Sequence, residues 1–66
     1  MIPIGTKVMI NDEGHYRYGI DEGNPQGVIG TVIECEAFDQ EDWINVEWPN
    51  DRTNNYEDGT LDIVEG

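Results

Sequence analysis

The residues of this chain with the most chemistry to offer are its carboxylates. The sequence holds 15 Asp and Glu against 3 Lys and Arg, which gives a formal net charge of −12. Two carboxylates across a cleft can act as general acid and base, clustered oxygens can hold a hard cation, and an array of negative charge can steer a basic partner. A chain of 66 residues buries too little surface for a deep cleft, so we expect a protein that is not an enzyme.

No metal or cofactor site is predicted. His15 is the only histidine and Cys35 the only cysteine, and no further residues stand at zinc-ligand spacing from them. The segment 51–56 is rich in side-chain oxygens but lacks the Gly and the closing Glu of an EF-type calcium loop. Serine is absent, so no nucleophilic triad is indicated.

The charge balance also limits the partners. Affinity for a nucleic-acid backbone or an anionic membrane surface comes from Lys and Arg, so direct binding to either is not expected. The longest apolar run, Val8-Met9-Ile10, is too short to span a membrane. A lone cysteine suits a reducing compartment, and we expect a cytoplasmic protein.

The sequence is compatible with two interpretations of its acidic residues. Their density imitates the phosphates of a nucleic acid and captures a basic protein, or it only solvates the surface. On the first interpretation, the partner-binding carboxylates come from two connecting segments: Asp12, Glu13, Asp21, Glu22, Asp39, Glu41 and Asp42.

The elements that position these side chains are predicted to be strands. Gly and Pro interrupt the chain throughout, and no window keeps a helical period for three turns. Alternation of apolar and polar residues is clearest in segment 43–48, where Ile44, Val46 and Trp48 share one face. The predicted strands cover residues 6–10, 28–36, 43–48, 54–56 and 61–64.

Two connections stand out. Residues 37–42 form a short acidic hairpin connection, whereas 11–27 is long for a loop without structure, and loops of that length are often functional. Gly30, inside an apolar run, indicates a bulge or a close backbone approach. We therefore expect an all-β fold, a single domain over residues 1–66 in which five strands close into a small barrel with a long first loop and the last strand beside the first.

Aromatic side chains supply candidate binding anchors, because aromatics dominate interface hot spots. Trp48 belongs to the core by its alternation, and Trp43 lies on the opposite face, where it either binds a partner or covers the end of the barrel. Tyr16, Tyr18 and Tyr56 could extend this anchor along the long loop.

The order of several short motifs resembles the SH3-like barrel of the mind-bomb type. They are Gly5-Thr6-Lys7-Val8, residues 18–23, Gly27-Val28-Ile29-Gly30-Thr31-Val32, residues 46–50, Asn54-Asn55-Tyr56 and Asp62-Ile63. The resemblance implies a non-catalytic module that recognises protein segments through aromatics beside the long loop. The family pattern has a Trp in that loop and a basic residue after the Tyr, where this chain has Tyr16, Tyr18 and Glu57.

Small acidic proteins of this kind also resemble accessory products of bacteriophages, which would place the chain in the host cytoplasm. The function expected is an acidic module that docks on a basic protein, with a nucleic-acid-binding protein blocked by a DNA mimic as its specific form. The alternative is peptide recognition by exposed aromatics. Steep salt dependence of binding is expected for the first and shallow dependence for the second.

Overall fold

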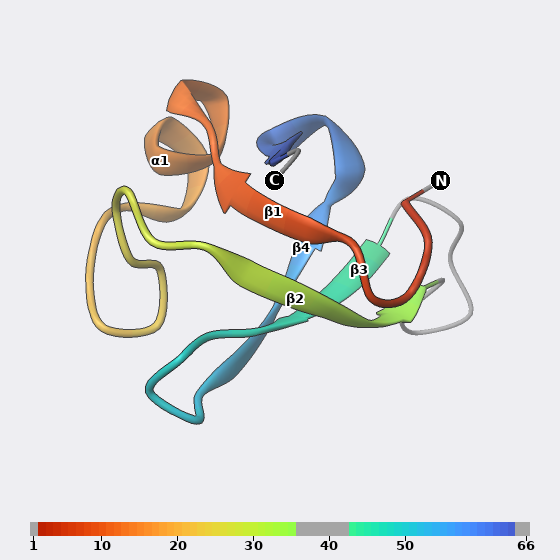
Figure 1. Cartoon of the computed structure of the whole chain (residues 1–66). Coiled ribbons are helices and arrows are strands. Elements are labelled where there is room, and N and C mark those ends of the chain that lie inside the picture. The colour runs from red at the N-terminus through yellow and green to blue at the C-terminus, as the bar shows by residue number, and fades with distance from the viewer. Residues whose placement is uncertain (1, 36–42, 65–66) are drawn as a thin grey trace.

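The computed structural model describes residues 2–35 and 43–64 (Figure 1). Within these ranges the chain forms strands and two short helical elements. In chain order they are β1 (Lys7–Ile10), α1 (Asp12–Tyr18), β2 (Gly30–Cys35), β3 (Trp43–Glu47), β4 (Thr53–Glu57), the 3-10 helix η2 (Asp58–Thr60) and β5 (Leu61–Ile63).

The five strands form one antiparallel sheet with the order β4-β3-β2-β1-β5. The predicted all-β class is confirmed, and so is the return of the last strand to the side of the first, with Val8 opposite Ile63. The sheet bends strongly, so that β3 and β4 cross the direction of β1 and β2 (Figure 1).

Closure of the sheet into a barrel is not observed. In the described ranges no ladder joins β4 to β5, because the three residues of η2 turn the chain away between them. The outer edge of β4 is instead covered locally. The Asn55 N–H donates to the side chain of Asn54 (3.0 Å), and the Glu57 N–H donates to the Tyr18 hydroxyl (3.2 Å). Edge groups bonded in this way cannot pair with another strand.

The core lies on the concave face of the sheet and follows the predicted alternation. In β1 Val8 and Ile10 are buried while Lys7 is exposed, and in β3 Ile44 and Val46 are buried while Glu47 is exposed. The remaining buried hydrophobic residues are Ile2, Val32, Trp48, Tyr56 and Leu61.

Gly30 is the point where β2 passes over the core tryptophan. A Cβ atom at this position would lie 2.6 Å from both the Trp48 ring and the Val46 side chain. The close backbone approach predicted here is therefore confirmed, whereas the bulge in β2 falls further along, between Val32 and Glu34. The strand begins at Gly30 rather than at Val28, and residues 36–42 lie outside the described ranges.

The segment 11–27 was expected to be a loop, and this expectation is wrong for its first part. Residues 12–18 form the helix α1, which begins where the Asn11 side chain accepts a hydrogen bond from the Gly14 N–H (3.0 Å). Acidic Asp12 and Glu13 lie in its first turn and Arg17 in its last, the placement that the helix dipole favours. Capping and charge, not an apolar stripe, account for this helix.

Candidate interaction surface

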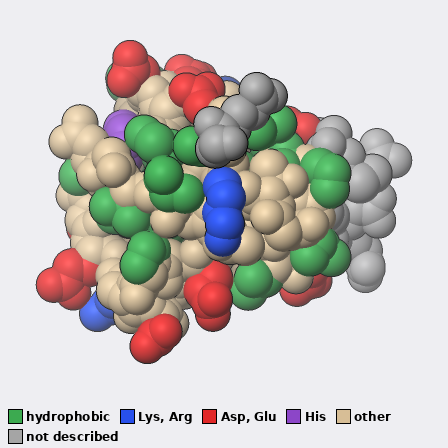
Figure 2. Space-filling view, in the orientation of Figure 1, with side chains coloured by type: hydrophobic (Ala, Val, Ile, Leu, Met, Phe, Trp, Pro, Cys, Tyr) green, Lys and Arg blue, Asp and Glu red, His purple; other side chains and the backbone are tan. Residues whose placement is uncertain are grey.

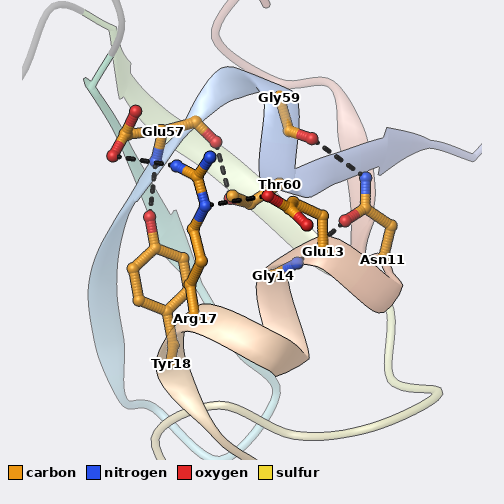
Figure 3. Close-up of polar contacts among 8 residues, drawn as sticks. All are labelled: Asn11, Glu13, Gly14, Arg17, Tyr18, Glu57, Gly59 and Thr60. Atoms are coloured by element: carbon orange, nitrogen blue, oxygen red, sulfur yellow. Dashed lines mark hydrogen bonds and ion pairs between the residues drawn. The ribbon is translucent and has the colours of Figure 1, made fainter.

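The helix α1 packs on η2, and these two elements and the last residue of β4 carry a group of charged side chains and one exposed tyrosine. We call this the α1–η2 surface, and it comprises Asp12, Glu13, Tyr16, Arg17, Glu57 and Asp58. Asn11 fixes the junction, because its side-chain amide donates to the Gly59 carbonyl (3.1 Å) while its oxygen caps the helix (Figure 3). The Asn11 backbone N–H also donates to the Thr60 carbonyl (3.0 Å).

Gly14 allows the helix to approach this closely. It is buried, and a Cβ atom at this position would lie 2.5 Å from the Ile10 side chain and 2.6 Å from the Thr60 carbonyl oxygen. Any larger residue would push α1 away from η2, since real Cβ atoms do not come so near to a backbone oxygen. The glycine thus holds the carboxylates of the two elements on one surface.

Arg17 lies between a carboxylate of α1 and the carboxylate of Glu57, the last residue of β4. Its Nε is 3.1 Å from a Glu13 oxygen and its Nη1 is 3.3 Å from a Glu57 oxygen (Figure 3). The hydrogen bond to Glu13 raises the pKa of the guanidinium, and the charges of Glu13 and Glu57 add to the effect. The arginine of the helix is therefore engaged within the protein, whereas Asp12 makes no ion pair with any described residue.

The two tyrosines of α1 differ in solvent exposure. Tyr16 is 87% exposed. Tyr18 packs against the core, with its ring 5.4 Å from that of Tyr56, centroid to centroid, and edge to face. Of the two residues predicted as anchors in this segment, only Tyr16 stands free for a partner.

Tyr56 is fully buried, which corrects its prediction as an exposed contact. Its hydroxyl accepts a hydrogen bond from the Trp48 indole N–H (3.1 Å) and lies 2.8 Å from both the Gly23 carbonyl and Asn24 Oδ1. Burial raises the pKa of the Tyr56 hydroxyl, and the hydrogen bond from Trp48 opposes that rise. Trp48, predicted as core, is 1% exposed.

Trp43 lies on the outer face of β3, as the alternation predicts, and is half-buried there opposite Glu57 of β4. It starts β3 where the described range resumes after residue 42. Its neighbour Glu57 belongs to the α1–η2 surface. Trp43 and Tyr16 lie on different elements, β3 and α1.

Of the remaining predicted carboxylates, two lie in the described part of the chain and three do not. Asp21 and Glu22 are exposed in the segment that follows α1. Asp21 accepts from the N–H groups of Gly23 (2.8 Å) and Asn24 (2.9 Å), and Glu22 pairs with Arg52 at 3.1 Å, so both serve to hold this segment. Asp39, Glu41 and Asp42 lie outside the described residues.

The acidic side chains are distributed over the surface. In Figure 2 they lie around the margin of the view, with hydrophobic side chains between them and a basic side chain near the centre. A DNA duplex of the molecule's longest extent, 26 Å, would carry roughly 15 phosphate charges at about 1.7 Å per charge. The net charge of −12 is comparable in amount.

The described residues were also searched for a pocket and for a metal-binding group. No pocket is found there, and no three His, Cys, Asp or Glu side chains are grouped so as to hold a metal ion. His15, half-buried on α1, has its Nδ1 3.4 Å from the Gly19 carbonyl. Within residues 2–35 and 43–64, no helix has the length and apolar character needed to cross a membrane.

Three contributors to this surface were not predicted from the sequence: Arg17, Glu57 and Asp58. Arg17 and Glu57 come from distant segments, and their ion pair follows from the packing of α1 on η2. A local signal did exist, because Asn11 is a favoured N-cap residue and Glu13 stands four residues before Arg17. These cues predict a helix even without apolar periodicity.

The fold and this surface define a small, acidic, all-β protein. No family model, curated protein or solved structure matches the chain. The resemblance to mind-bomb-type domains therefore rests on the motifs of the sequence.

Proposed function

We propose that this protein is a non-enzymatic binding module that docks on a basic protein surface through its α1–η2 surface. The observation that carries the proposal is Tyr16, which is 87% exposed on a helix whose first turn is acidic. A large exposed aromatic side chain on the same helix as two carboxylates suits a partner with cationic groups, because carboxylates steer the encounter and the ring contributes contact area and cation–π attraction.

The interactions of the basic residues also support a positively charged partner. Arg17 and Arg52 are held by the protein's own carboxylates, and the Lys7 ammonium donates to the Thr31 hydroxyl (2.6 Å). Asp12, Glu34, Glu47 and Asp51 make no ion pair with the described residues. The negative potential that remains unneutralised is therefore available to a positively charged partner.

The specific form we propose is a DNA mimic that occupies the groove of a nucleic-acid-binding protein. The total charge, comparable to that of an equally long duplex, supports it. Peptide recognition by an aromatic groove has less support, because Tyr18 and Tyr56 pack inside and no pocket is found in the described ranges.

The test is competition with DNA. Purified basic DNA-binding proteins, each loaded with a fluorescent duplex, are titrated with the protein at several salt concentrations, and the release of duplex is followed by anisotropy. We expect displacement that weakens steeply with salt and is reduced by Tyr16→Ala. Tyr16→Phe is the matched control, because it keeps the ring. Binding that ignores salt, or that Tyr16→Ala leaves unchanged, would contradict the proposal.

A further inference from the structure

The strand β5 has an unpaired backbone edge. Strand β1 covers one side of it, and the hydrogen bonds at both ends of this pairing are Asn11 N–H to the Thr60 carbonyl (3.0 Å) and Val64 N–H to the Lys7 carbonyl (2.8 Å). In an antiparallel pair, opposite residues alternate between bonded and non-bonded positions. The register of Val8 with Ile63 and Ile10 with Leu61 therefore falls on the non-bonded positions.

It follows that the backbone groups of Leu61 and Ile63 point away from β1. The Leu61 N–H is used by η2, where it donates to the Asp58 carbonyl. The Leu61 carbonyl, the Ile63 N–H and the Ile63 carbonyl have no partner among the described residues, because β5 ends the sheet. Together they form the template for one more strand.

The side chains along this edge are also open. Ile63 is 55% exposed although it lies opposite the fully buried Val8. Asp62 is exposed on the other face and accepts a hydrogen bond from the Asn11 amide (3.3 Å), which places it beside the α1–η2 surface. This edge differs from that of β4, where a side-chain amide and the Tyr18 hydroxyl cover the backbone.

We propose that β5 accepts an extended segment of the basic partner by strand addition, an inference that rests on the proposed function. Side chains of an added strand alternate between the two faces. A residue opposite Ile63 would be apolar, and its neighbours along the segment would lie on the face of Asp62 and be Lys or Arg. The charge favours this occupant over a second copy of the chain, because two copies would bring together −12 and −12.

The experiment uses two end-blocked peptides of equal charge. In the first, arginine alternates with valine, and in the second, prolines replace the valines so that the segment cannot add as a strand. Affinities are measured by calorimetry for the whole chain. We expect the valine peptide to bind on the order of tenfold tighter, since two or three backbone hydrogen bonds separate the two.

The decisive variant is Ile63→Pro, which removes the outward N–H and leaves the β1 side of the strand intact, as edge strands tolerate. It should make the two peptides bind equally, whereas Ile63→Ala, which keeps the N–H, should preserve most of the difference. If Ile63→Pro does not fold, amide exchange in the unaltered protein gives the same answer. The Ile63 amide should become protected by the valine peptide and not by the proline peptide.

The possible failures are distinct. Equal binding of both peptides to the unaltered protein, with steep salt dependence, would overturn strand addition and leave the proposed function standing. Binding of neither peptide would overturn both. Sedimentation that shows a dimer broken by Ile63→Pro would assign the edge to a second copy and would also overturn strand addition by a partner.

Discussion

Removing the hydroxyl oxygen of the buried Tyr56 should lower the free energy of unfolding substantially, although only one atom is lost. Tyr56→Phe keeps the buried ring but deletes the hydroxyl that accepts from Trp48 and lies 2.8 Å from the Gly23 carbonyl and Asn24 Oδ1. The last two oxygens still accept from the Asn54 amide, at 3.3 and 3.1 Å. Trp48 is only 1% exposed, and its indole N–H loses its hydrogen-bond acceptor in this variant.

The expected loss is about 2 kcal/mol, because an orphaned buried donor costs about 1–3 kcal/mol. A domain of this length has roughly 3–10 kcal/mol of stability in all, at about 0.05–0.15 kcal/mol per residue. The melting temperature should therefore fall by about 8–16 °C, since each kcal/mol corresponds to about 4–8 °C in domains of this size. Urea unfolding followed by tryptophan fluorescence, with thermal unfolding by circular dichroism, measures both quantities.

Tyr16→Phe is the matched control, because it deletes the same atom from a side chain that is 87% exposed. It should change the free energy of unfolding by less than about 0.5 kcal/mol. If the two variants unfold at the same urea concentration, the hydrogen-bond network around Tyr56 does not stabilise the fold, and our assignment of that residue to the core network is wrong.

Three further predictions concern the same architecture. Gly30→Ala should destabilise the fold by about 1–3 kcal/mol in urea, because its Cβ would lie 2.6 Å from the Trp48 ring, whereas Gly59→Ala, with nothing within 4 Å, should not. Burial raises the folded-state pKa of Tyr56 above its usual 10.0, so its contribution to stability should be complete below pH 10 and decline as the pH rises toward the folded value; if Tyr56→Phe shows the same alkaline decline, another group causes it. Asn11→Ala should cost about 1 kcal/mol and reduce the helical circular dichroism, because it removes the cap of α1, and an unchanged spectrum would contradict that role.

The strands could be predicted because their signal is local. Alternation of Ile44, Val46 and Trp48 with polar residues requires one buried face, and the structure buries those three residues. The close approach at Gly30 could be anticipated for a similar reason, because a glycine in an apolar run has a small number of explanations. The failure of β4 and β5 to pair could not be predicted, because it depends on how η2 redirects the chain.

The candidate surface was harder to predict because its residues meet across the fold. Tyr16 and Tyr18 are two residues apart, and only the orientation of α1 on η2 decides that one is exposed and the other packs on Tyr56. Hydrophobic periodicity could not reveal α1, because its buried residue is Gly14. The N-cap at Asn11 carried the signal for the helix in its place.

The proposed function requires the negative charge to act at a particular place, the α1–η2 surface. The most direct measurement compares Asp12→Asn with Asp51→Asn in the affinity for one basic partner protein. Each variant removes one charge. Asp51 lies in the β3–β4 turn, which Figure 1 places at the opposite end from α1, and its φ of 65° suits Asn. We expect Asp12→Asn to weaken binding about two- to fivefold, the effect of an exposed charge pair, with Asp51→Asn close to the unaltered protein. Equal losses for the two variants would show that the surface acts only through its total charge.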